Sequence, residues 1–184
     1  MPLKVVAVSG SLRAGSVNSA LLRAAALLAP SDMTITLYEE VAALPHFNPD
    51  LEAAAPPAVA RWQNLLRECD ALLIACPEYA HGVPGSFKNA LDWVVGTMDL
   101  ADKPVALLNT SPRAQHAHAA LAEIITTMGW KVVEAASVRI PCARKGVELG
   151  NPGDMAEFAE SLLDALLALR DAAQHHVGQR FPAS

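Results

Sequence analysis

The stretch that decides the fold of this chain, residues 5–26, reads VVAVSGSLRAGSVNSALLRAAA. It passes from a short apolar strand, through a loop of small and hydroxyl residues, into an amphipathic helix. The first turn of a helix leaves backbone N–H groups without partners at the positive end of its dipole, which favours a bound anion. Ser11, Ser16 and Asn18 add side-chain donors, and Arg13 adds a forked cation. We therefore expect this loop to hold a phosphate group.

Two common phosphate-binding loops do not match these residues. A nucleoside-triphosphate loop has a lysine directly after its second glycine, whereas Ser16 follows Gly15 here. The dinucleotide-binding loop needs a glycine two residues after its first, and that position is Leu12. A loop rich in Ser and Asn with one arginine suits a terminal monophosphate, such as that of flavin mononucleotide (FMN). Taken alone, the loop also fits an ordinary strand-to-helix turn in which the serines only cap the helix.

Apolar runs alternate with helical patterns along the chain. The apolar runs predict strands over 4–9, 33–38, 71–76, 104–109 and 131–138. The helical patterns predict helices over 18–29, 57–68, 84–96, 114–128 and 154–173. Thr110 and Ser111, followed by Pro112, have the pattern of a cap ahead of the fourth of these helices.

Five strand–helix units in succession predict an α/β protein with a three-layer flavodoxin-like fold. Its five-stranded parallel sheet has the order 2-1-3-4-5 and carries helices on both faces. We expect a single domain over residues 1–173, in which residues 44–57 form a turn-rich loop. The polar residues 174–184 predict a flexible tail.

Composition excludes several classes of function. Of 184 residues, 52% are hydrophobic and 18% charged, which favours a compact globule. The net charge of −5 gives no electrostatic footprint for nucleic acid, and no apolar run approaches the length of a membrane span. The first residues read as the start of a strand, so we expect no cleavable signal. An odd set of three cysteines without metal-binding spacing favours free thiols, so we expect a cytoplasmic protein.

Three loops are expected to converge on one ligand. The first is SGSLRAGSVN; the second, PEYAHGVPGSFKNALDW (residues 77–93), follows the third strand; the third, NTSPRAQ (residues 109–115), follows the fourth strand. In the predicted strand order, ligands bind beyond the carboxyl ends of strands one and three. The first two loops therefore meet at the expected binding site.

The second loop suits the polar edge of a flavin ring. Its prolines and glycines hold the backbone in a defined shape, so that N–H and C=O groups can match the ring's alternating acceptors and donors. Tyr79 and His81 offer flat surfaces beside the ring, and Glu78 is either a proton relay or a carboxylate that orders the backbone. Judged alone, the loop fits a Pro/Gly turn that enters a helix equally well.

GSLRAGSVN followed by PEYAHGVPGSFKNALDW resembles the NADPH-dependent FMN reductase family, which includes flavin-dependent quinone, chromate and azo-dye reductases. The resemblance covers residues 4–130. It implies a tightly held FMN that is reduced by NADPH or NADH and passes electrons to quinones or similar small-molecule acceptors, so that no side chain is itself catalytic. It further implies a homodimer or homotetramer. The cofactor-binding residues that it implies are Ser11, Arg13, Ser16, Val17, Asn18, Pro77, Glu78, Tyr79, Ala80, His81, Gly82 and Ser111.

Two departures from the family pattern bear on the site. The family commonly has asparagine where this chain has Ala80, so a side-chain contact is lost there while backbone contacts remain. The third loop, TSPRAQ, is shorter than in many relatives, which affects how the far side of the ring is covered.

Two other functions fit the same fold. A flavodoxin-type electron carrier would pass single electrons and bind no nicotinamide, but such carriers are strongly acidic and cover the flavin with aromatic side chains. A flavin-free binding domain would take up no FMN at all. The sequence leaves NADH and NADPH equally open, because no loop carries a recognisable clamp for the adenosine 2′-phosphate.

The other histidines do not have the spacing of a metal site. His116 and His118 lie two apart on a predicted helix and so point to different faces, while His175 and His176 lie in the predicted tail and are expected to be solvated. Trp62 and Trp93 are interpreted as packing residues, and Lys88 is expected to pair with Asp92 one helical turn later.

Overall fold

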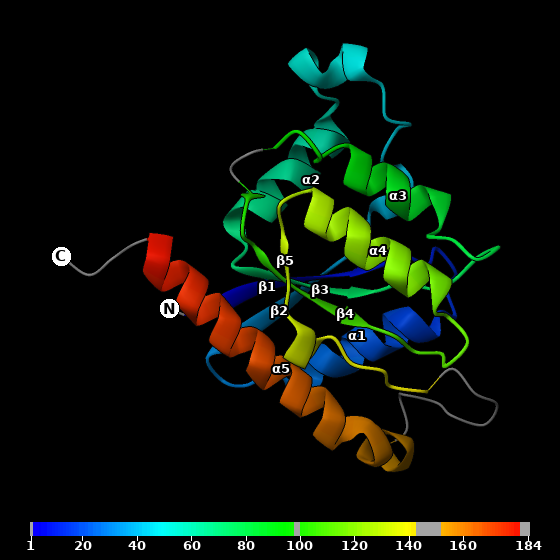
Figure 1. Ribbon diagram of the computed structural model, residues 1–184, viewed down its shortest axis with the longest axis vertical. Coiled ribbons are helices and arrows are strands. Elements are labelled where there is room, and N and C mark those ends of the chain that lie inside the picture. The colour runs from blue at the N-terminus through cyan, green and yellow to red at the C-terminus, as the bar shows by residue number, and fades with distance from the viewer. Residues whose placement is uncertain (1, 98–99, 143–151, 181–184) are drawn as a thin grey trace.

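Five parallel strands form one sheet in the order β2-β1-β3-β4-β5 (Figure 1). The structure is a computed structural model that describes residues 2–97, 100–142 and 152–180. The strand order and the parallel pairing confirm the predicted fold. The strands are β1 (Leu3–Ser9), β2 (Met33–Tyr38), β3 (Ala71–Ala75), β4 (Pro104–Leu108) and β5 (Lys131–Val132).

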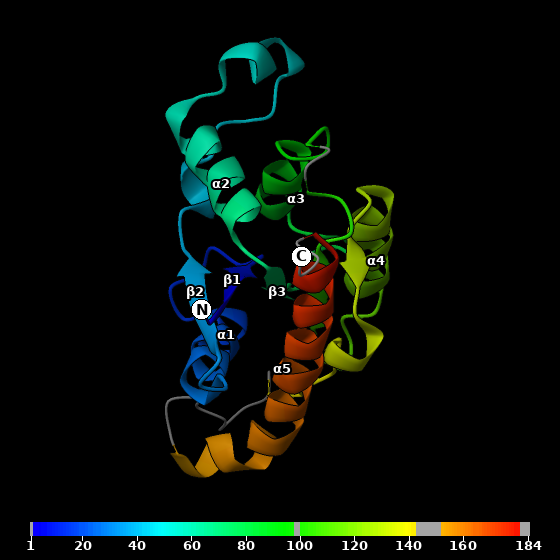
Figure 2. The same ribbon diagram turned by 90° about the vertical axis from the view of Figure 1, so that its left-hand side faces the viewer.

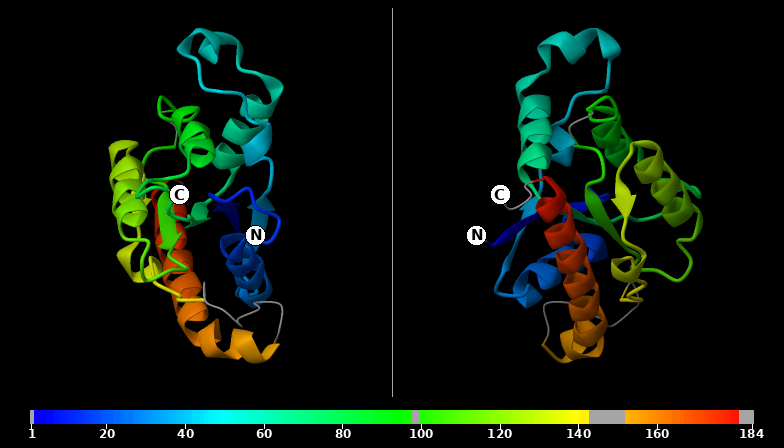
Figure 3. Two further views of the ribbon diagram at one scale, coloured as in Figure 1. Left: turned by 90° about the vertical axis from the view of Figure 1, so that its right-hand side faces the viewer. Right: turned by 60° about the vertical axis from the view of Figure 1, so that its left-hand side comes forward.

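Helices cover both faces of the sheet, which gives the three predicted layers (Figure 2). One face carries α1 (Val17–Leu28) and α5 (Pro152–Arg180). The other carries α2 (Pro57–Glu68), α3 (Gly85–Asp92) and α4 (His116–Thr127). Short 3₁₀ helices occupy Val41–Ala43, Pro49–Ala54 and Glu134–Ala136. The second of these lies on a segment that projects away from the sheet beside α2 (Figure 3).

The strand β1 connects two hydrophobic cores. Val5 and Ala7 pack into the core under α1 and α5, whereas Val6 and Val8 pack into the core under α2, α3 and α4. Successive side chains of a strand point to opposite faces, so a strand buried on both faces is apolar at nearly every position. This is why the continuous apolar runs predicted the central strands so closely.

Buried tryptophans and a helical ion pair hold the second layer together, as expected. Trp62 is fully buried and its indole N–H donates to the carbonyl of Ala90, 2.8 Å away. Trp93 is also buried and donates to the carbonyl of Pro45. The Lys88 ammonium lies 2.5 Å from an Asp92 carboxylate oxygen.

The fifth strand is much shorter than the predicted 131–138. After Val132 the chain turns through the 3₁₀ helix Glu134–Ala136, and the Ser137 hydroxyl accepts a hydrogen bond from the Leu107 amide in place of a strand carbonyl (3.1 Å). Pairing resumes only at an isolated bridge between Asn109 and Arg139. The Ser137 side chain therefore replaces a backbone hydrogen bond that a longer β5 would have made.

Two helices also differ from the prediction. The helix α3 ends at Asp92 rather than at residue 96. The helix α4 begins at His116, beyond the expected cap at Ser111, whose hydroxyl instead accepts from the Arg113 amide within a turn.

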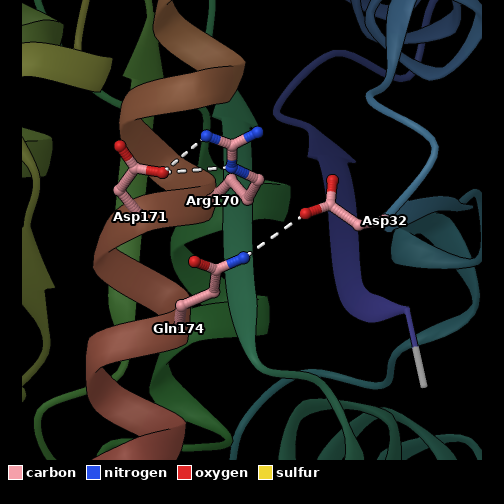
Figure 4. Close-up of polar contacts among 4 residues, drawn as sticks. All are labelled: Asp32, Arg170, Asp171 and Gln174. Atoms are coloured by element: carbon pink, nitrogen blue, oxygen red, sulfur yellow. Dashed lines mark hydrogen bonds and ion pairs between the residues drawn. The ribbon is translucent and has the colours of Figure 1, made fainter.

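The last helix continues past its predicted end at residue 173 as far as Arg180. Gln174, in the expected tail, donates to the Asp32 carboxylate at 3.3 Å, next to the Arg170–Asp171 pair (Figure 4). His176 is buried rather than solvated, whereas His175 is exposed. Residues 174–180 are therefore helical, and 181–184 lie outside the described residues. None of the helices described here is long and apolar enough to cross a membrane.

Candidate functional site

A cavity of about 390 Å³ opens at the carboxyl edge of the sheet, where the loops after β1, β3 and β4 meet. Its volume lies in the range typical of small-molecule sites. The first loop contributes all five residues predicted from it, and Pro77, Glu78, Tyr79 and Ser111 also line the cavity. Ser16 and Tyr79, 63 positions apart in sequence, thus share one cavity. The complete lining is Ser11, Arg13, Ser16, Val17, Asn18, Pro77, Glu78, Tyr79, Thr110, Ser111, Arg113 and Ala114.

The first loop presents free donors at the start of α1. Ser16 is the N-cap, and its hydroxyl accepts from the Ser19 amide at 3.3 Å. In the described part of the chain, the amides of Val17 and Asn18 have no hydrogen-bond partner. These amides, together with the hydroxyl of Ser11 and the guanidinium of Arg13, form the donor set that an anion requires.

Gly10 brings the first and second loops into contact. A Cβ atom at this position would lie 2.7 Å from the Cys76 sulfur and 3.2 Å from Cδ of Pro77. Only glycine fits this close approach without a shift of the backbone beside it. The distance between the two loops therefore depends on the absence of a side chain at Gly10.

The first and third loops are joined by a buried hydrogen bond. The Thr110 hydroxyl donates to the Asn18 side-chain oxygen at 3.1 Å, and both side chains are buried. Asn109 orders the rest of the third loop, because its side chain donates to the Ala114 carbonyl and accepts from the Ser111 amide. Because Thr110 bonds to the side-chain oxygen of Asn18, the side-chain NH₂ group of Asn18 remains available to the cavity.

The second loop contains a tight turn from Tyr79 to Gly82. These two residues exchange both backbone hydrogen bonds, at 3.1 and 3.0 Å, and the two residues between them have positive φ angles: 49° for Ala80 and 60° for His81. Positive φ at both central positions is the pattern of a type I′ hairpin turn, which favours Asn and Gly. The asparagine common in the family therefore matches the backbone that this turn requires.

Ala80, His81 and Gly82 are not among the residues that line the cavity, although they were predicted to contact the cofactor. Ala80 and His81 are exposed at the tip of the turn. The His81 ring stacks on the ring of His116, with centroids 4.3 Å apart and an angle of 17° between the planes. Gly82 pairs with the backbone of Tyr79, and the His81 stack connects the second loop to α4.

Glu78 connects the second loop to the third. Its carboxylate accepts a hydrogen bond from the Ala117 amide at 2.9 Å, in the first turn of α4. The N-cap of this helix, Gln115, makes no side-chain cap hydrogen bond, so Glu78 satisfies an amide that the local sequence leaves open. This contact supports the interpretation of Glu78 as an ordering carboxylate.

Three residues that line the cavity, Thr110, Arg113 and Ala114, were not assigned to the site from the sequence. The third loop was identified as the motif NTSPRAQ, but only Ser111 was assigned to the site. Arg113 adds a second arginine to the cavity lining, which contains a single carboxylate, that of Glu78. The neighbouring thiol of Cys76 adds no charge, because burial raises its pKa to about 12. In the described residues, no cluster of three or more His, Cys, Asp or Glu side chains could hold a metal ion.

Known proteins resemble this chain in both sequence and structure. It is 43% identical over 112 residues to an NAD(P)H-dependent FMN reductase of Pseudomonas aeruginosa, a match covering 59% of this chain and 60% of that protein. It is 40% identical over 114 residues to a quinone reductase of Pseudomonas putida, covering 60% and 61%. The chain thus spans about 60% of the length of these curated relatives.

The structural match is more extensive. FerB of Paracoccus denitrificans, a flavoenzyme NAD(P)H:(acceptor) oxidoreductase, superposes with a TM-score of 0.83 at 30% identity, covering 95% of this chain and 98% of that chain. The family model of the NADPH-dependent FMN reductases matches residues 3–145, which include all three loops of the cavity. The fold, the motifs and this match together show that the chain belongs to the NADPH-dependent FMN reductase family.

Proposed function

We propose that this protein is an FMN-dependent oxidoreductase that takes electrons from NADPH or NADH and delivers them to quinones or similar small acceptors. The observation that carries the proposal is the cavity where three loops meet, because it combines donors for a phosphate from the first loop with Pro77 and Tyr79 from the second. The names of the relatives in P. aeruginosa, P. putida and P. denitrificans support the same chemistry.

The residues of the first loop fit the phosphate end of FMN. The unpaired amides of Val17 and Asn18, the hydroxyls of Ser11 and Ser16 and the guanidinium of Arg13 would bind its oxygens. A phosphomonoester carries nearly two negative charges at neutral pH, which the helix dipole and the guanidinium stabilise. No lysine or metal ion is needed for this single phosphate.

The second and third loops fit the ring end. Pro77 and Tyr79 provide apolar surface, and the paired backbone of the Tyr79–Gly82 turn holds that surface in place. Ser111 and Arg113 face the cavity from the third loop. When bound, FMN supplies the hydride and electron chemistry. The chain binds and orients it, keeps water from one side, and places donors near the carbonyl groups of the ring.

Protons would come from solvent or from the hydroxyl of Tyr79, which lines the cavity and is half exposed. No side chain of the cavity needs to act as a nucleophile. Because one site would serve both the nicotinamide and the acceptor, the two substrates would bind in turn, and we expect ping-pong kinetics.

One observation separates this proposal from a flavodoxin-type carrier. Tyr79 is the only aromatic residue among the described residues that line the cavity, whereas carriers cover the flavin with aromatic rings. Rapid anaerobic mixing with NADPH or NADH tests the difference. We expect the flavin absorbance to bleach within seconds, while a carrier would stay oxidised. A purified protein that takes up no FMN would be the flavin-free domain instead.

The proposal also covers the cellular compartment and the oligomeric state of the enzyme. The three cysteines, Cys69, Cys76 and Cys142, are free thiols, which supports a reducing compartment such as the cytoplasm. We also propose a homodimer or homotetramer, as implied by the family resemblance. Light scattering during size-exclusion chromatography measures the assembly directly, and a monomeric mass would contradict it.

A further inference from the structure

Two stacked histidines join the second loop of the cavity to α4. The His81 and His116 rings lie with their centroids 4.3 Å apart and their planes inclined by 17°. His81 belongs to the tight turn between Tyr79 and Gly82, and His116 is the first residue of α4. Both side chains are exposed to solvent, so protons reach them freely. The proposed function gives this pair no role.

The backbone at one end of the stack is strained. Ala80 and His81 have φ angles of 49° and 60°, in the left-handed region that favours glycine and asparagine. Other residues keep such angles only where their surroundings hold them, and these positions cluster at functional sites. The ring contact with His116 is a contact of this kind, because it holds the tip of the turn against a helix.

The stack is one of two contacts described between this loop and the first turn of α4. The other is the hydrogen bond from the Ala117 amide to the Glu78 carboxylate, at 2.9 Å. Tyr79 follows Glu78 and precedes the strained pair, so it lies between the two contacts along the chain. It is also the aromatic residue that this loop contributes to the cavity. The position of its ring therefore depends on both contacts.

A histidine stack responds to pH in a way that other ring contacts do not. Imidazoles change charge between about pH 5 and pH 8. A neutral ring stacks favourably on a neutral or a charged one, whereas two cations in contact repel each other. His116 lies at the positive end of the α4 dipole, which opposes a charge there as well. The contact with His81 is therefore attractive until both rings are protonated.

Other charged or titratable groups lie on the elements that carry the stack. Those nearest to it in sequence are Glu78, Tyr79, Arg113 and His118. The Glu78 carboxylate, already bonded to the Ala117 amide, partly offsets positive charge on the pair, whereas Arg113 on the third loop adds to it. His118 points to another face of α4, where burial and then Arg139 lower its pKa. It is therefore not part of the stack.

We propose that the His81–His116 stack is an acid-sensitive contact that positions Tyr79 for binding of the electron acceptor. Neither histidine lines the cavity, so both are positioning residues that act through Tyr79. The inference rests on the proposed function, because it assigns acceptor binding to the cavity beside Tyr79. At neutral pH the stack holds the turn against α4. In acid the second proton separates the rings, Tyr79 loses its position and the acceptor binds more weakly.

The kinetic test measures the KM of the FMN-loaded protein for 1,4-benzoquinone, a neutral acceptor without an ionisable group. From about pH 8 to about pH 5 we expect this KM to rise about 5-fold, the effect of two unit charges 4 Å apart in water. His116→Phe keeps a flat ring that cannot be charged, so its KM should stay nearly constant. His116→Ala loses the stack and should show the raised KM at both pH values.

His46→Phe is the matched control, because it makes the same replacement at an exposed histidine outside this contact and should follow the wild-type protein. An acid rise in KM that persists in His116→Phe would overturn the inference. So would a KM of His116→Ala that equals the wild-type value at neutral pH.

Amide hydrogen exchange of residues 78–83 tests the contact without turnover. Wild-type protein and His116→Phe are compared at the same pH, so that the intrinsic effect of pH on exchange cancels. We expect the loop to exchange faster in the wild-type protein in acid and equally in both at neutral pH. Equal exchange in acid would contradict the inference. Failure of the proposed function appears separately, as a protein that takes up no FMN or whose flavin neither nicotinamide bleaches.

Discussion

Single residues determine how the three loops come together. Gly10 permits contact between the first and second loops, Asn18 bonds across to Thr110, and Glu78 bonds to the start of α4. None of these interactions depends on a long-range electrostatic effect. Each can be removed by one substitution. Measuring both FMN affinity and the free energy of unfolding then shows whether the interaction supports binding or stability.

Arg13→Ala tests the phosphate end of the cavity. A hydrogen bond to a charged group contributes about 1.5–3 kcal/mol, so FMN affinity should fall by about 10- to 150-fold. Fluorescence titration measures this, because free flavin is bright and bound flavin is commonly quenched. Riboflavin, which lacks the phosphate, is the internal control, and its affinity should not change. An unchanged affinity for FMN would place Arg13 away from the phosphate.

Ala80→Asn tests the strain in the Tyr79–Gly82 turn. Ala80 has a φ of 49°, a left-handed conformation that costs a non-glycine residue about 1 kcal/mol and that asparagine tolerates better. We expect the free energy of unfolding to rise by about 0.5–1 kcal/mol in urea titrations. Ala29→Asn, at a φ of −56°, should give no such gain. A loss of stability in Ala80→Asn would contradict the turn geometry.

Cys76 predicts a particular dependence of stability on pH. Burial raises the pKa of its thiol from 9.0 to about 12. Above pH 9 the unfolded chain loses this proton while the folded chain keeps it, so the free energy of unfolding should fall by about 1.4 kcal/mol per pH unit up to pH 12. Comparing urea unfolding of the wild-type protein and Cys76→Ala isolates this contribution. Parallel pH profiles of the two proteins would refute it.

Among the secondary-structure elements, α4 shows how distant residues complete what local sequence leaves unfinished. Ser111 has the pattern of a cap, but the helix starts five residues later and an amide of its first turn is satisfied by Glu78, 39 positions away. The edge strand β5 is shortened in a similar way, because the Ser137 hydroxyl accepts the hydrogen bond of the Leu107 amide. In both places a side chain takes over a backbone hydrogen bond.

Glu78→Ala should therefore destabilise the fold by about 0.5–2 kcal/mol, the usual cost of losing a helix cap. It should also weaken FMN binding, because the second and third loops lose their connection. Urea unfolding and FMN titration measure the two effects. The control Glu123→Ala removes an exposed carboxylate from α4, the helix that Glu78 caps, and should change stability by less than about 0.5 kcal/mol. Equal results for the two variants would show that the Glu78 contact has no structural role.

For the molecule as a whole, the sequence predicts most of what depends on neighbours along the chain. The apolar runs located the central strands, and the small residues around Ser11 located a loop that lines the cavity. What it missed depends on contacts across the fold. Arg113 lines the cavity from the third loop, which is joined to the first loop by the hydrogen bond between Thr110 and Asn18, two residues 92 positions apart.

The sequence also placed the turn residues Ala80, His81 and Gly82 in the site on the basis of their family pattern. None of the three lines the cavity, and Gly82 exchanges both backbone hydrogen bonds with Tyr79. A pattern within one loop can identify a turn, but it does not show which residues of that turn line the cavity. The His81–His116 stack depends on a second element and could not be predicted locally.

The most direct measurement is a paired titration of flavin-free protein with FMN and with riboflavin, followed by absorbance and fluorescence. Because the first loop lines the cavity with donors for a phosphate and the second lines it with Pro77 and Tyr79, we predict saturable binding of FMN and binding of riboflavin that is at least about 10-fold weaker. A protein that binds neither flavin, or both equally well, would contradict this account of the three-loop cavity.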